Sequence, residues 1–278
     1  EEVEKSEITP YEDSGNVASL IENELAPANI ISTKKLEEFD AVEWKFENNA
    51  TVVFRKADFE KDNVSLQSFS PGGTSLFEAD DLYTANMISQ FIEAFGVGEF
   101  DAITLKKVLT GKKAGISIGL GGLTESIRGL STPKDFEAMM QLLYLQFSNP
   151  RFDEEAYNAL KSRYVAFLTN MANNPQKIMQ DSLSMIFSNY NERTKLMTTN
   201  MFDEISYSQM EKLYKDRFKD AGDFTFFIVG NIEEDIAKEM AAKYIGNLKD
   251  DPREENWIDR NVRSPKGKTL KKIEVPLQ

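Results

Sequence analysis

The sequence predicts an α+β fold in which helices cover one face of a largely antiparallel sheet. Three observations lead to this prediction. Apolar residues alternate with polar ones in several short segments, which is the pattern of half-buried strands. In other segments apolar residues recur every three or four positions, which is the pattern of amphipathic helices. Along the chain, the predicted order is strands, helix, strands, helices, strand and helix.

The predicted strands are short and are separated by turn residues. In the segment 42–47, apolar residues alternate with charged ones, and the Asn48-Asn49 turn leads into the next strand, so this pair is predicted to form a hairpin. A second hairpin is predicted around the turn from Gly119 to Gly122. In chain order, the predicted strands cover residues 42–47, 51–56, 64–69, 114–118, 123–130 and 224–229.

The predicted helices combine helical spacing of apolar residues with recognisable first turns. Pro133 and Pro175 stand at two first turns, where a proline removes no hydrogen bond. Asp153 is a predicted N-cap, and the acidic residues at 233–235 suit the positive end of a helix dipole. In chain order, the predicted helices cover residues 80–95, 134–147, 153–171, 175–187, 206–218 and 233–245.

Composition divides the chain into three parts. Residues 1–41 are acidic with only short apolar stretches, so they are predicted to be an N-terminal extension or linker with room for a short helix near 17–25. Residues 42–249 hold the other predicted elements and form the domain. Residues 250–278 are charged, contain three prolines and are predicted to be a linker towards a following subdomain. The first residues lack the pattern of a signal peptide and look like the start of a piece of a longer chain.

The composition excludes several classes of function. The 278 residues carry 33 basic and 46 acidic side chains, and a net charge of −13 repels nucleic acid and anionic membranes. No apolar run approaches the roughly 20 residues of a membrane-spanning helix. The chain contains neither Cys nor His. Ser-His-Asp and Cys-His catalysis are therefore excluded, and a zinc site would have to be built from carboxylates alone.

Several local patterns have a simple structural explanation. Gly72-Gly73 and the turn 119–122 lack a phosphate-loop signature, so both are predicted to be plain turns. Acidic clusters mostly precede helices, where capping and the dipole explain them. Hydrolysis by a carboxylate pair stays open as a third hypothesis, and it requires two carboxyls facing one cleft. These acidic clusters cover residues 78–81, 153–155, 233–235 and 250–251.

Three motifs in order along the chain carry a family resemblance. They are Ser-Pro-Gly-Gly-Thr-Ser at 70–75, Ser-Asn-Pro-Arg-Phe-Asp at 148–153 and Phe-Thr-Phe-Phe-Ile-Val-Gly-Asn-Ile at 224–232. Together they resemble the insulinase/pitrilysin family of zinc metallopeptidases, over residues 42–249. The resemblance implies the metallohydrolase fold of the mitochondrial processing peptidases.

The resemblance also shows which site residues are missing. Catalytic members of the family carry H-x-x-E-H on the helix after the glycine turn, with two His and a later Glu on zinc. The matching positions here are Asn86, Ser89 and Gln90, and no carboxylate lies between Lys161 and Gln180 to replace the later Glu. This chain is therefore expected to supply no catalytic residue and no metal ligand, and its substrate-binding residues are unknown.

One further motif of the family is also missing. In related proteins, the second subdomain of the inactive half presents an Arg and a Tyr, with about six residues between them as in R-x6-Y, towards the substrate. In this chain the pair Arg163-Tyr164 is adjacent on a predicted helix and is expected to be structural.

Within the family, the chain is similar to the non-catalytic C-terminal half of a zinc-dependent metalloendopeptidase. The resemblance implies that it encloses and binds peptide substrate beside a separate catalytic half, which belongs to the same polypeptide or to a partner subunit and holds the zinc. Alone, the chain is expected to be inactive, and its acidity would favour basic or neutral peptides. The alternative is a purely structural scaffold module of the same fold. A homodimer is possible, and analogy with the family favours the bacterial periplasm or cell envelope.

Overall fold

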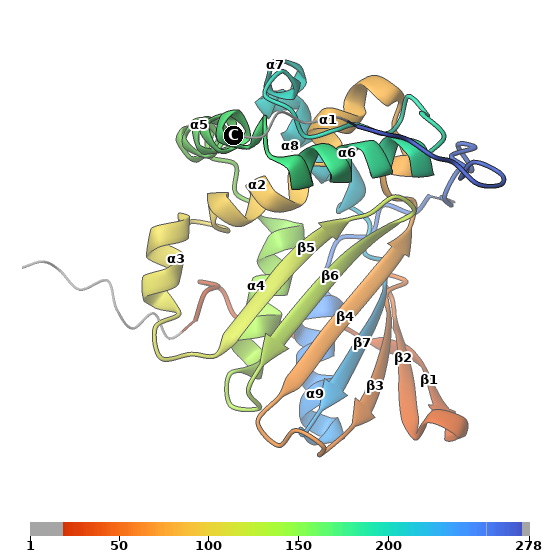
Figure 1. The fold of residues 1–278 in the computed structure, drawn as a ribbon. Helices are drawn as coiled ribbons and strands as arrows, with labels where there is room; N and C mark the ends of the chain where they lie inside the picture. The colour runs from red at the N-terminus through yellow and green to blue at the C-terminus, as the bar shows by residue number, and fades with distance from the viewer. Residues whose placement is uncertain (1–18, 254, 274–278) are drawn as a thin grey trace, which may run out of the picture.

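The chain folds around one seven-stranded sheet with the strand order β1-β2-β3-β7-β4-β6-β5 (Figure 1). The structure is a computed structural model that describes residues 19–253 and 255–273. Strands β3 and β7 pair in parallel, and the other neighbouring strands pair antiparallel. The strands are β1 (Ile30–Leu36), β2 (Ala41–Phe46), β3 (Thr51–Lys56), β4 (Val64–Pro71), β5 (Ala114–Leu120), β6 (Thr124–Ser131) and β7 (Thr225–Gly230).

Helices α4 and α9 lie behind the sheet, and most other helices gather at one end of it (Figure 1). Asp153 and Asn174 cap α5 and α6 by accepting backbone N–H bonds, and Ser206 does the same for α8. The helices are α1 (Leu82–Ala85), α2 (Ile88–Phe95), α3 (Ala102–Val108), α4 (Phe136–Ser148), α5 (Glu154–Met171), α6 (Pro175–Phe187), α7 (Met201–Glu204), α8 (Tyr207–Arg217) and α9 (Glu234–Met240). The predicted class, an antiparallel-rich sheet covered by helices, is confirmed.

The core lies between the sheet and the helices behind it. Alternate residues of β2, among them Trp44 and Phe46, are fully buried, and so are Phe226 and Ile228 of β7. The apolar stripe of α4 covers this face, and burial of such side chains contributes roughly 1.5–3 kcal/mol each. One sheet face therefore provides the hydrophobic core and the other remains available to contact something else.

The first strand, β1, lies within the segment 1–41 that was expected to be an extension. It pairs antiparallel with β2 along the edge of the sheet. Its residues are almost all exposed, so its sequence lacks the alternation that identifies a half-buried strand. The helix expected at 17–25 is absent from its described part, residues 19–25. There Leu20 is buried and its N–H donates to the side-chain oxygen of Gln141 on α4.

Two other elements differ from the expectation. The helix predicted over 80–95 is interrupted at Asn86 and Met87, where the Met87 N–H donates to Thr84, three residues back, and the helix is split into α1 and α2. Helix α3 was not predicted; Asp101 caps it by accepting bonds from Ile103 and Thr104. Among the described residues, no helix is long and apolar enough to cross a membrane.

Candidate functional site

The helix α1–α2 occupies the position that would carry the metal motif. Asn86 is exposed at the break between the two pieces, and Gln90 is exposed one turn later. The Ser89 hydroxyl accepts a bond from the N–H of Leu120 at 3.1 Å and is half-buried. Two amides and a hydroxyl lack the imidazole and carboxylate donors that zinc prefers. In the part of the chain that the structure describes, no group of three or more acidic side chains is placed to hold a metal ion.

Helix α5 packs against α2 through aromatic rings rather than through a carboxylate. The ring centroids of Phe91 and Tyr157 lie 5.1 Å apart, and those of Phe91 and Tyr164 lie 6.2 Å apart. Tyr164 also stacks on Phe202 of α7. This aromatic cluster fixes α5 against α2 and fills the space between them with side chains that bind no metal.

The two glycine turns are hydrogen-bonded to one another. The N–H groups of Gly72, Thr74 and Ser75 donate to backbone carbonyls of the turn 121–123, at 2.8–2.9 Å. The N–H of Gly73 donates to the Glu125 carboxylate at 2.9 Å. All four N–H groups that could hold a phosphate are therefore used internally. Their role as plain turns follows from these bonds.

A groove of about 820 Å³ lies over Asn86 between α5, α6 and the loop after α6. We call it the α5–α6 groove. Its floor and walls include Phe167, Met179 and Met197, and its charged lining is Lys177, Asp181, Arg193 and Lys195. A second hollow of about 440 Å³ shares Asn86 and Arg193 with it and is bounded by the segment 257–263.

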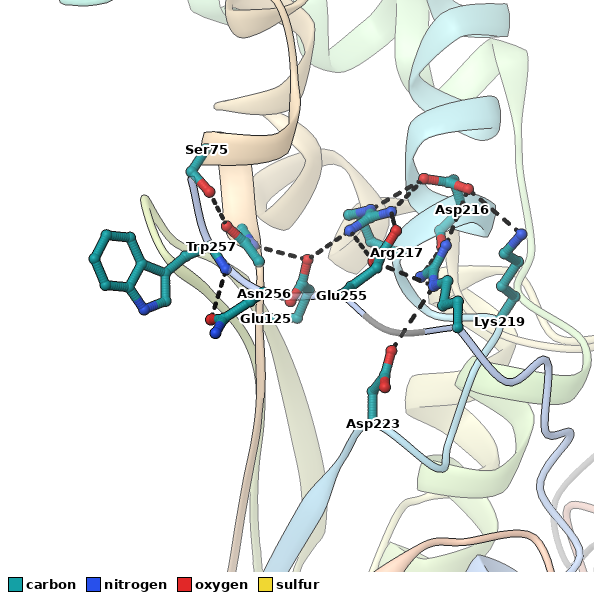
Figure 2. Close-up of polar contacts among 12 residues, drawn as sticks. Ser75, Glu125, Asp216, Arg217, Lys219, Asp223, Glu255, Asn256 and Trp257 are labelled. Atoms are coloured by element: carbon teal, nitrogen blue, oxygen red, sulfur yellow. Dashed lines mark hydrogen bonds and ion pairs between the residues drawn. The ribbon is translucent and has the colours of Figure 1, made fainter. Parts of the chain in front are cut away.

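A buried ion network joins the sheet, α8 and the C-terminal segment (Figure 2). Arg217, which is 4% exposed, donates to both oxygens of Glu255 at 2.8 and 3.1 Å and lies 3.5 Å from Glu125. Asp216 accepts from the same guanidinium at 2.6 Å. Burial raises the pKa of Glu125, although Arg217 and the Gly73 N–H oppose that rise. The network fastens Glu255 of the C-terminal segment to the end of the domain.

The comparisons with known proteins agree with this geometry. A family model described as "Peptidase M16 inactive domain" matches residues 204–277. The probable zinc protease PqqL of Haemophilus influenzae is 19% identical over 228 residues, which are 81% of this chain and 24% of that protein. The solved periplasmic protease PqqL of Escherichia coli superposes with a TM-score of 0.75 at 20% identity, covering 95% of this chain and 29% of that one.

The resemblance to the insulinase/pitrilysin family of zinc metallopeptidases, which is also called M16, is confirmed. The ferredoxin protease FusC, solved in complex with Arabidopsis ferredoxin, has the same fold, with a TM-score of 0.68 at 12% identity over 87% of this chain and 26% of that one. The chain spans about a quarter of the length of the curated relatives that it matches.

In this M16-like domain, the acidic clusters named from the sequence lie near the ends of helices and strands, where they cap a helix or pair with side chains of other segments. Asp153 caps α5, and Glu78 pairs with Arg260 at 3.2 Å. Glu233, before α9, pairs with Lys56 at 2.6 Å. Asp250 accepts a bond from the Asn49 side chain at 2.9 Å. These contacts tie segments together and explain the clusters without catalysis.

The open face of the sheet is the surface that sequence reasoning missed. Figure 1 shows this face towards the viewer, and in the described part of the chain no helix covers it. Phe69 of β4 stacks on Phe227 of β7 with centroids 5.8 Å apart. Further along the same face, Leu130 of β6 and Val229 of β7 lie on either side of Ser65 of β4 and are exposed to 56% and 37%. The outward positions of these strands carry the signal, because Phe, Leu and Val there have no core to face.

Proposed function

We propose that this chain is a non-catalytic domain of a zinc-dependent metalloendopeptidase, where it encloses and binds peptide beside a separate catalytic half. One observation carries the proposal: the M16 fold is intact while Asn86, Ser89 and Gln90 stand on the helix where metal chemistry would need His and Glu. Such a domain contributes shape and surface, and the zinc belongs to the catalytic half.

The open sheet face supports the enclosure of peptide. It offers a broad surface with apolar side chains at Phe69, Leu130 and Val229, beside polar ones at Gln67 and Arg128. A peptide covering such a face would remove apolar area from water at about 25 cal/mol per Å². Similar proteins are described as proteases, and one is held in complex with a whole protein, which supports a polypeptide ligand.

The proposal includes a partner and a place. Since the relatives are about four times longer than this chain, the catalytic half would be another part of the same polypeptide or a partner subunit. The solved PqqL protein is described as periplasmic, which supports a periplasmic or envelope location.

A photocrosslinking experiment tests the enclosure. The crosslinking residue p-benzoylphenylalanine is placed at Leu130 on the open face or, as the control, at Ile236 on α9 behind the sheet; the two are exposed to 56% and 48%. Each variant is mixed with the catalytic half and a labelled peptide whose scissile bond is replaced by a non-hydrolysable one. Illumination should couple the peptide to position 130 and leave position 236 unlabelled.

Equal labelling at both positions, or labelling at 236 alone, would show that the open face does not meet the peptide. Complete absence of labelling while the two halves form a complex would favour the scaffold function instead. Complex formation is followed in the same samples by size-exclusion chromatography, so that a failure to assemble is recognised.

A further inference from the structure

The α5–α6 groove carries features that the helix break and the open sheet face do not explain. It lies at the end of the sheet where α5, α6 and the C-terminal segment come together (Figure 1). Asn86 and Arg193 line both the groove and the second hollow, so the two hollows adjoin at the position of the missing metal motif. Their lining includes residues of α5, α6, the loop after α6 and the segment 257–263, so an extended peptide could contact side chains from all of these segments.

Apolar side chains line the α5–α6 groove and remain exposed. Phe167 and Met179 are both 55% exposed, and Met197 of the following loop is 40% exposed. Leu123 and Trp257 extend the same apolar lining into the second hollow. Exposed apolar side chains gathered in a concave surface mark an interaction site, and the flexible side chain of Met adapts to varied partners.

The charges in the groove run against the charge of the whole chain. Lys177 pairs with Asp181 at 2.5 Å, which leaves Arg193 and Lys195 as the other lining charges. Among the described residues, neither of these two cations lies within ion-pair distance of a carboxylate. The guanidinium of Arg193 donates to the carbonyls of Phe77 and Thr74, and the ammonium of Lys195 lies 5.0 Å from the ring centroid of Tyr83.

We propose that this groove binds an apolar peptide segment that carries acidic residues. The inference rests on the proposed function, because it names the class of peptide that the domain receives. The apolar side chains of the segment would cover Phe167, Met179 and Met197, and its carboxylates would reach Lys195 and Arg193. A carboxylate of the peptide would give these two cations the direct ion pair that no described side chain gives them, and a partly enclosed ion pair is stronger than an exposed one. The net charge of −13 describes the chain as a whole, whereas the groove is locally positive.

Binding is measured by fluorescence anisotropy with the whole chain, residues 1–278, and three labelled twelve-residue peptides. The first contains Leu, Phe and Met with Asp and Glu between them, the second replaces the acids by Lys, and the third replaces the apolar residues by Ser while it keeps the acids. The first peptide should bind at least about tenfold more tightly than either of the others. Added salt should reduce the difference in affinity between the acidic and the basic apolar peptides.

Two variants connect binding to the groove. Lys195→Glu should lower the affinity for the acidic apolar peptide about fivefold, since it replaces an attraction between charges by a repulsion. Met179→Asp should lower the affinity for the same peptide, because it places a negative charge in the apolar wall of the groove. Lys34→Glu on the edge strand β1, which contributes no residue to either hollow, changes the net charge as much as Lys195→Glu and should leave binding unchanged. Circular dichroism of each variant confirms that it is folded.

Several outcomes would overturn the inference. Equal affinity for the acidic and basic apolar peptides, or equal loss with Lys195→Glu and Lys34→Glu, would show that the groove cations do not select the ligand. Dimers that dissociate with Met179→Asp would show that a second copy of the chain covers the groove. In both cases peptide labelling at Leu130 would still report on the proposed function, so the two failures are distinguishable.

Discussion

Replacement of Arg217 by Met should destabilise the domain strongly and in a pH-dependent way. The variant keeps an unbranched, flexible side chain, although a shorter one, and removes the cation that lies 3.5 Å from Glu125, a carboxylate that is 1% exposed. Loss of one partner of a buried ion pair typically costs about 3–5 kcal/mol. The contacts to Asp216 and Glu255 add little, because those carboxylates are partly exposed and can turn to water.

Proton uptake sets an upper limit on that cost. Without Arg217, Glu125 can become neutral, and its usual pKa is 4.5. At pH 7.5 this protonation costs about 4 kcal/mol, and the cost falls by roughly 1.4 kcal/mol for each pH unit below that. The loss of unfolding free energy should therefore be at most about 4 kcal/mol at pH 7.5 and at most about 1.4 kcal/mol at pH 5.5. The double variant Arg217→Met with Glu125→Gln removes both charges and should recover most of the loss.

Urea unfolding measures these differences. The chain has two tryptophans: Trp44 is fully buried in the core and Trp257 is half-exposed in the C-terminal segment. A Trp257→Phe background leaves Trp44 as the reporter of the core, and the linear dependence of unfolding free energy on urea gives the difference between variants. A loss below about 1 kcal/mol at pH 7.5, or a loss that does not change with pH, would refute the dependence of Glu125 on Arg217.

Three further predictions concern a turn, a partly buried acid and the open face of the sheet. Gly73 has a φ of +61°, and an added Cβ would stand 2.4 Å from the backbone oxygen of Gly121. Gly73→Ala should therefore lower the unfolding free energy, measured by urea titration, by at least about 1–3 kcal/mol. An unchanged unfolding free energy would contradict the turn geometry. Burial and the carboxylate of Asp220 raise the pKa of Asp223 to about 6, so the folded chain holds this proton more tightly than the unfolded chain. The resulting stabilisation is complete below pH 3.8 and is lost as the pH rises through 6; Asp223→Asn should flatten this decline, and an unchanged slope would argue against it. Leu130→Asp should change the unfolding free energy by no more than about 0.5 kcal/mol, as other surface substitutions do, but should lower peptide cleavage in the complex with the catalytic half. Full cleavage activity of this variant would exclude the open face from substrate binding.

Local periodicity was enough to predict most of the fold. The hairpin 42–56, the apolar stripe of α4, the N-cap Asp153 and the first-turn Pro175 each depend on residues close in sequence, and these elements are present in the structure. Strand β1 was missed because an edge strand that faces water on both sides needs no apolar alternation. The break at Asn86 was missed because apolar residues continue in helical spacing on both sides of it.

The candidate sites were less accessible to sequence reasoning, since they join distant segments. Glu125 meets Arg217 and Glu255 only after the sheet, α8 and the C-terminal segment have packed together. The acidic residue at an inward position of β6, two residues before the buried Ile127, was the available signal of a buried partner. The charge of the groove was also hidden, because composition averages its cations with acids elsewhere on the surface.

The most direct test of the central claim is the cleavage of a quenched fluorescent peptide. The chain is assayed alone and then mixed with the catalytic half, the part or partner that carries the H-x-x-E-H motif, with zinc and with a chelator. We expect no cleavage by the chain alone and an increase in the activity of the catalytic half on mixing, with the chelator abolishing that activity. Cleavage by the chain alone that the chelator removes would contradict it, since neither Asn86 nor Gln90 can replace a zinc-binding histidine.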